Sequence, residues 1–90
     1  MKRKYFLTQK QIRQIVKSYG GFRKYQYNQK VGNEYDKLYL HEKSNPSLWL
    51  CIYYNYKLKI TEVTLTNDTG VIIQRDSWDN DNDIMFKITN

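Results

Sequence analysis

Alanine is absent from this sequence, and cysteine and proline each occur once. The lone cysteine, Cys51, excludes an internal disulfide, so the chain is unlike a small disulfide-stabilised secreted scaffold. The longest apolar run, from Leu48 to Tyr54, is far shorter than the ~20 residues that span a bilayer. The apolar stretch after the basic start is too short for a signal peptide. We therefore expect a soluble protein of the cytoplasm.

The composition also indicates where such a chain comes from and how large a unit it forms. Ninety residues predict a single small domain over residues 1–90, because two halves would each be too small to bury a core. Aromatic residues make up 16% of the chain, which argues against disorder. Lys, Tyr, Asn and Ile, whose codons are AT-rich, are abundant where alanine is missing. This bias is typical of a low-GC bacterium or of its phages and mobile elements.

Acidic residues are missing from the first third of the chain. Residues 1–30 hold nine Lys or Arg and no Asp or Glu, whereas residues 61–90 hold two bases and six acids. The overall net charge of +6 therefore combines +9 and +1 in the first two thirds with −4 in the last. Such a split predicts two surfaces of opposite charge.

One helix is predicted, from about Gln9 to Tyr19. Thr8 followed by Gln11 is a capping-box pattern, and Gly20 with Gly21 is suited to ending the helix. Four apolar residues recur with helical spacing and share one face: Ile12, Ile15, Val16 and Tyr19.

Beyond the glycines the apolar period becomes two, which predicts strands. The expected fold is α+β, with one N-terminal amphipathic helix packed on an antiparallel sheet of five or six strands. A change of parity around Thr61–Glu62 predicts a bulge or a bend there. An uncapped edge strand from Val71 to Arg75 leaves room for a homodimer. The expected strands cover approximately residues 24–30, 35–41, 48–54, 58–65, 71–75 and 84–88.

No motif with a specific catalytic or metal-binding signature is present. His41 and Cys51 are too few for a zinc site, and the D-x-D-x-D run from Asp79 lacks the glycine and the final glutamate of a calcium loop. Cys51 lies within the most apolar segment, where a small core residue is expected. We expect no cofactor, no metal and no catalytic residue.

One enzyme class needs no fixed signature. The chain resembles the small ribonuclease toxins of the RelE type in its size, its basic charge and its α+β class. This resemblance implies cleavage of messenger RNA by scattered Arg, Lys, Tyr and His side chains. A ribonuclease toxin is therefore the alternative to a protein that only binds.

Basic and aromatic residues alternate in the first third of the chain, a pattern typical of nucleic-acid binding. Three cations are spaced to lie on one helix face, opposite the apolar stripe. Others follow the glycines, between tyrosines that could stack on bases. The alternative is that the tyrosines are half-buried strand residues and the lysines only keep the protein soluble. The candidate residues for binding nucleic acid or an acidic partner are Lys10, Arg13, Lys17, Arg23, Lys24, Tyr25 and Tyr27.

The acidic segment from Asp76 to Asp83 is the second candidate surface. Trp78 between aspartates suggests an exposed loop in which an aromatic anchor and carboxylates contact a basic protein. The alternative is a polar loop with the tryptophan folded onto the sheet. The candidate residues for a protein partner are Trp78, Asp79 and Asp81.

These features favour a non-enzymatic binding protein that is encoded by a phage or other mobile element. We expect it to act on nucleic acid or on a nucleoprotein complex of the host or of its defences. The most specific form of this hypothesis is an anti-CRISPR-like or other anti-defence inhibitor. A plain DNA- or RNA-binding regulator is a further alternative.

Overall fold

The computed structural model describes residues 7–28, 37–55, 57–79 and 84–87 of the chain. One helix comes first and is followed by strands, so the α+β class expected from the sequence is confirmed. The elements are α1 (Gln9–Ser18), β1 (Tyr25–Tyr27), β2 (Lys37–Glu42), β3 (Trp49–Asn55), β4 (Ile60–Thr66), β5 (Ile72–Asp79) and β6 (Ile84–Lys87).

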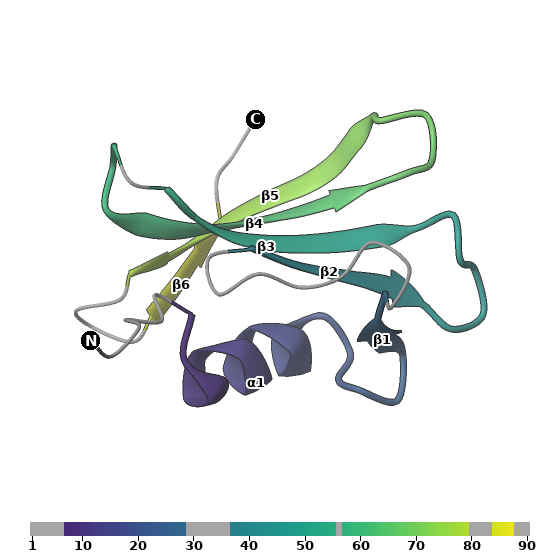
Figure 1. Cartoon of the computed structure of the whole chain (residues 1–90), viewed down its shortest axis with the longest axis horizontal. Coiled ribbons are helices and arrows are strands. Elements are labelled where there is room, and N and C mark those ends of the chain that lie inside the picture. The colour runs from purple at the N-terminus through teal and green to yellow at the C-terminus, as the bar shows by residue number, and fades with distance from the viewer. Residues whose placement is uncertain (1–6, 29–36, 56, 80–83, 88–90) are drawn as a thin grey trace, which may run out of the picture.

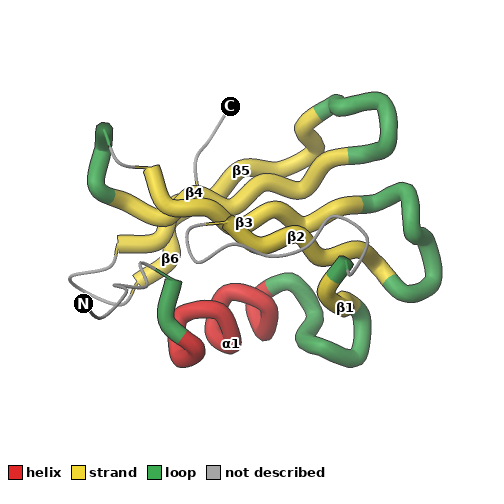
Figure 2. The backbone as a smooth tube through the Cα atoms, viewed as in Figure 1, coloured by secondary structure: helices red, strands yellow, loops and turns green. Residues whose placement is uncertain are grey.

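The strands form one antiparallel sheet in which each strand pairs with the next strand along the chain. The helix α1 lies across one face of this sheet (Figure 1). No described helix or strand covers the other face, which we call the open face (Figure 2). The two faces therefore have different surroundings, although they belong to the same strands.

Local signals fix both ends of α1. Thr8 accepts a hydrogen bond from the Gln11 backbone N–H at 3.1 Å, and the Gln11 side chain accepts one from the Thr8 N–H at 3.5 Å. At the other end, Gly20 N–H donates to the Lys17 carbonyl and Gly21 N–H donates to the Val16 carbonyl. This pair of bonds is a Schellman motif, and both glycines have positive φ angles, 120° and 83°.

The core lies between α1 and the sheet. Alternate residues of β2, β3 and β4 point toward the helix, because successive side chains of a strand point to opposite faces. Burying such side chains contributes about 1.5–3 kcal/mol each. The apolar members with no exposed surface are Ile15 and Val16 of α1 with Leu40, Leu50, Ile52 and Val63 of the sheet.

The prediction of a bulge at Thr61–Glu62 is wrong. β4 runs through these residues without a break, and the register shift lies between Leu65 and Thr66. The apparent change of parity has another cause: Leu58 precedes β4 and is 62% exposed, and Ile60 faces the open side whereas Val63 and Leu65 face α1. Only residues from Ile60 onward follow the alternation of β4.

The acidic loop expected after residue 75 is also placed wrongly, because β5 continues to Asp79. Its second half, from Asp76 to Asp79, pairs with β6. Along its first half, no strand within the described residues pairs on that side. Within the described residues, the segment from Ile72 to Arg75 therefore lies at an edge of the sheet, and β5 is internal only from Asp76 to Asp79. Three exposed apolar side chains, Val71, Ile72 and Ile73, lie at or just before the start of this edge.

Candidate nucleic-acid interface

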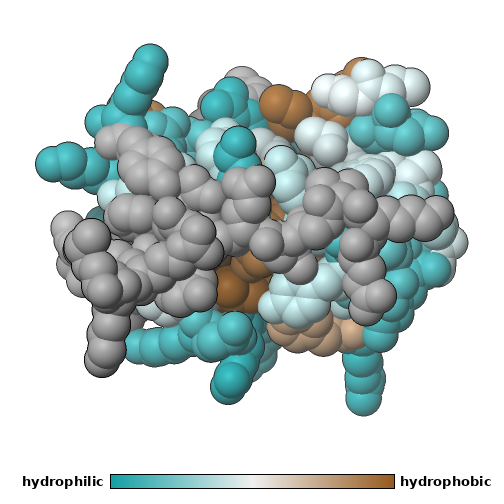
Figure 3. All heavy atoms as spheres, in the orientation of Figure 1, coloured by the Kyte–Doolittle hydropathy of each residue, from teal (hydrophilic) through white to brown (hydrophobic). Residues whose placement is uncertain are grey.

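The outer face of α1 carries three cations. Lys10, Arg13 and Lys17 are all exposed, because the helix buries its opposite side against the sheet. In Figure 3, hydrophilic atoms gather along the lower edge, where α1 lies. Residues 7–28 contain no Asp or Glu.

Lys24 extends the positive charge past the end of the helix. A Cβ atom added at Gly20 would lie 2.9 Å from Lys24 Cδ, which shows that the lysine stem crosses over this glycine. The Lys24 ammonium lies 5.7 Å from the centre of the Tyr25 ring. A cation at this position also faces the negative end of the helix dipole. The Gly20 conformation and the Tyr25 ring together place Lys24 beside the last turn of α1.

A cation of α1 also lies near a residue of β1. Burial raises the pKa of Tyr27, and the nearby Arg13 guanidinium partly offsets this increase. Arg23 and Lys24 are exposed in the connection between α1 and β1. We call Lys10, Arg13, Lys17, Arg23 and Lys24 the basic surface.

The two tyrosines predicted to bind bases do not share one environment. Tyr25 is only 1% exposed and belongs to the core, so the prediction that it stacks on bases is wrong. Burial, with the charge of Glu42, raises its pKa. Tyr27 is half-buried and packs against the core, with its ring centre 5.6 Å from that of Phe22. Tyr27 therefore fits the alternative of a half-buried strand tyrosine, and Tyr25 is buried more completely than that alternative expected.

The predicted protein-partner surface is not an exposed loop. Trp78 lies within β5 and is 3% exposed, so it cannot act as a surface anchor in this structure. It faces α1, on the same side of the sheet as Val63. Asp79 is half-buried at the end of β5, and Asp81 lies outside the described residues. The structure agrees with the alternative expectation, in which the tryptophan is packed against the protein instead of being exposed.

A buried carboxylate is a feature that the sequence pattern did not reveal. Asp76 is 1% exposed on the helix-facing side of β5. Its Oδ2 atom accepts hydrogen bonds from the Tyr19 hydroxyl and, at 2.9 Å, from the Gln74 side-chain amide. Oδ1 accepts none from the part of the chain described here. Burial is the main cause that raises the pKa of Tyr19, and the hydrogen bond to Asp76 raises it further.

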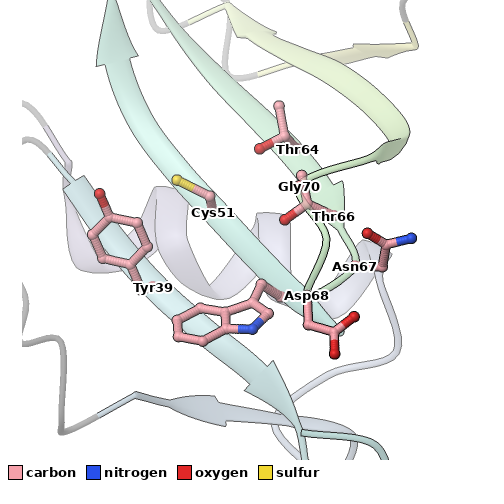
Figure 4. Close-up of a pocket in the computed structure, with 8 residues that line it drawn as sticks. Tyr39, Cys51, Thr64, Thr66, Asn67, Asp68 and Gly70 are labelled. Atoms are coloured by element: carbon pink, nitrogen blue, oxygen red, sulfur yellow. The ribbon is translucent and has the colours of Figure 1, made fainter. Parts of the chain in front are cut away.

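The open face holds a second group of residues that sequence reasoning missed. Tyr39 of β2 and Cys51 of β3 line a pocket (Figure 4). Trp49 of β3 lines it as well. Burial raises the pKa of the Cys51 thiol, which favours its neutral form. The signal was the small Cys51 between Trp49 and Tyr53 on one face of β3, which the apolar run conceals.

His41, a candidate for the ribonuclease alternative, also lies on the open face. Its Nε2 atom is 2.7 Å from the Gln26 side-chain nitrogen. Arg75 points to the same face from β5, but β3 and β4 lie between the two strands. Three strand spacings place the two strands ~14 Å apart. The structure therefore does not bring these residues together.

No group of three or more His, Cys, Asp or Glu side chains in the described ranges is placed to hold a metal ion. Within those same ranges, no helix has the length and apolar character required to cross a membrane. Comparisons with protein-family models, curated proteins and solved structures gave no significant match. The functional argument consequently rests on the residues of this chain.

Proposed function

We propose that the protein is a non-enzymatic binding protein whose basic surface contacts the phosphate backbone of nucleic acid, either free or within a nucleoprotein complex. The observation that carries this proposal is the exposure of five cations along α1 and the connection that follows it, without an acid in residues 7–28. Phosphates are the ligand that such a surface attracts most strongly.

The arrangement supports backbone contacts better than base recognition. Lysine and arginine on a convex helix face reach phosphates, and such contacts fix position without reading sequence. The buried Tyr25 ring is not available for stacking on this side. We therefore expect the contribution of the basic surface to affinity to depend strongly on salt and weakly on sequence.

The test is binding of labelled DNA and RNA by wild-type protein and by the Lys10→Glu/Arg13→Glu variant. The matched control is Lys57→Glu/Lys59→Glu, which changes the net charge equally at exposed positions outside the basic surface. We expect the first variant to lose at least about tenfold in affinity at about 50 mM salt, and the control to lose much less. Equal losses in both variants would show that only net charge matters.

The more specific form of the proposal is an anti-defence inhibitor that docks on a nucleic-acid-loaded complex of a bacterial host. It is tested by affinity purification from such a host, with and without nuclease treatment. A protein that remains bound after nuclease and is lost with Lys10→Glu/Arg13→Glu supports this form. Recovery of nucleic acid alone supports the plain DNA- or RNA-binding regulator instead.

The ribonuclease alternative is tested by incubating the purified protein with RNA. It predicts cleavage that is lost with His41→Ala or Arg75→Ala, and growth arrest on expression. The wide separation of the β2 and β5 strands argues against joint action of these two residues. Intact RNA after incubation and harmless expression would remove this alternative.

A further inference from the structure

The open face of the sheet contains a pocket of about 560 Å³. It lies over β2, β3 and β4 and reaches the turn that joins β4 to β5 (Figure 4). α1 packs on the opposite side of the same strands, so this pocket is separate from the basic surface. Its volume falls within the range of small-molecule sites, about 300–1,000 Å³.

Two aromatic side chains form one side of the pocket. Tyr39 of β2 pairs with Cys51, and Trp49 lies two residues before Cys51 on β3, so both rings stand on the same face. Both are half-buried, which leaves part of each ring accessible. Flat rings of this kind hold other flat rings by stacking, and a nucleobase gains about 1–3 kcal/mol from such a contact.

The floor is made of small side chains. Cys51 pairs with Thr64 across β3 and β4, and Thr66 follows two residues later on the same face. None of these side chains is large enough to fill the space beside the aromatic rings. The floor therefore leaves room for a planar group to lie beside Trp49 and Tyr39.

Charges of both signs border this site. Asp68, an exposed residue of the β4–β5 turn, lines the pocket (Figure 4). Arg75 pairs with Thr64 across β4 and β5, and Lys37 lies two residues before Tyr39 on the same face of β2. A ligand that fits this pattern presents N–H donors to a carboxylate and negative charge to two cations.

We propose that this pocket binds a base of single-stranded nucleic acid, with guanine preferred, while Lys37 and Arg75 contact the adjoining phosphates. Guanine presents two neighbouring N–H donors on its Watson–Crick edge, which match the two oxygens of Asp68. Adenine presents only one donor group on that edge. The inference rests on the proposed nucleic-acid function for its ligand class, but it uses a different face of the molecule.

The experiment measures fluorescence anisotropy of labelled pentanucleotides, UUGUU against UUAUU, each in ribo and deoxyribo form. It is run at about 0.2 M salt, where backbone contacts of the basic surface are weakened. The variants are Asp68→Asn and Trp49→Ala. Glu42→Gln is the control, because it neutralises a carboxylate on the opposite side of the sheet from the pocket.

We expect wild-type protein to bind UUGUU about tenfold more tightly than UUAUU, which corresponds to two hydrogen bonds to a charged group against one. Asp68→Asn reduces this ratio to about one. Trp49→Ala weakens binding of both oligonucleotides by about tenfold or more. Glu42→Gln changes neither value.

Equal binding of both oligonucleotides by wild-type protein, or no binding of either, overturns the proposal. An unchanged preference in Asp68→Asn does the same. If Trp49→Ala fails to fold, Asp68→Asn still tests the proposal, because Asp68 lies in an exposed turn. Lys10→Glu/Arg13→Glu separates the pocket from the basic surface. If the pocket recognises the base, this variant keeps the wild-type ratio of affinities for UUGUU and UUAUU. A loss of affinity for both oligonucleotides together reports on the basic surface alone.

Discussion

The hydroxyl of Tyr19, at the end of α1, donates a hydrogen bond to the buried carboxylate of Asp76 in β5. The two residues are 57 positions apart in the sequence. A buried carboxylate is costly unless its oxygens accept hydrogen bonds, so this contact supports both the helix end and the strand.

Tyr19→Phe should therefore destabilise the protein by about 1–3 kcal/mol, because it removes a donor from a buried acceptor. In a double-mutant cycle with Asp76→Ala, the combined loss should be smaller than the sum of the two single losses. Urea denaturation followed by circular dichroism measures each value. Strict additivity, within about 0.5 kcal/mol, would show that the two side chains are not coupled.

Gln11 joins the start of the same helix to the sheet. Its side chain belongs to the capping box and also donates to the Thr61 hydroxyl at 2.5 Å, in a buried position. Gln11→Ala should cost about 1–2 kcal/mol more than Gln14→Ala, an identical change at an exposed position of α1. Thermal unfolding of the two variants provides the comparison, and equal midpoints would contradict the expectation.

The two glycines after α1 should differ in their tolerance of a side chain. Both have positive φ angles, so alanine at either position costs about 1–2 kcal/mol. At Gly20 the new methyl group also meets Lys24, whereas nothing lies within 4 Å of that position at Gly21. We expect Gly20→Ala to lower the unfolding midpoint more than Gly21→Ala. The reverse order would mean that Lys24 does not pack over Gly20.

Tyr53 gives a prediction for alkaline pH. Burial, together with the hydrogen bond to Glu62 and the charge of that residue, raises the pKa of Tyr53 to about 12. Its stabilising contribution is therefore complete below about pH 10, the ordinary value for tyrosine, and is lost as the pH rises through about 12. After allowance for solvent screening, this loss is on the order of 1 kcal/mol.

The titration is measured by ultraviolet absorbance of the phenolate, as the difference between wild type and Tyr53→Phe. This subtraction separates Tyr53 from the other tyrosines of raised pKa. Glu62→Gln removes the negative charge and should move the Tyr53 midpoint toward its ordinary value. A midpoint that does not move would exclude Glu62 as a cause.

The helix could be predicted from the sequence because its signals are local. Thr8 and Gln11 identify its start, and Gly20 identifies its end. These residues act within a few positions of each other, so no tertiary information is needed.

The extent of β5 could not be predicted in the same way. The segment after Arg75 has the composition of a polar loop, but Gln74, Asp76 and Trp78 alternate toward the helix side. Asp76 lies there because Tyr19 and Gln74 satisfy its Oδ2 atom, and that pairing is visible only in three dimensions. The same reason hid the burial of Trp78 and removed the predicted protein-partner anchor.

The candidate site could likewise be predicted from the sequence only in part. Exposure of Lys10, Arg13 and Lys17 follows from helical spacing alone. The pocket beside Trp49 depends on register between β2, β3 and β4, and a pairing register cannot be read from one strand. Sequence reasoning consequently identified charges and missed the cavity.

The sequential order of the strands has a consequence for folding kinetics. Each strand pairs with its neighbour in sequence, so most of the sheet forms through short loop closures. The links from α1 to Thr61 and Asp76 span 50 and 57 residues and must wait until β4 and β5 are in place. We expect the hairpins to form first and the helix to dock late. Weakening either link should then accelerate unfolding and leave the rate of folding almost unchanged.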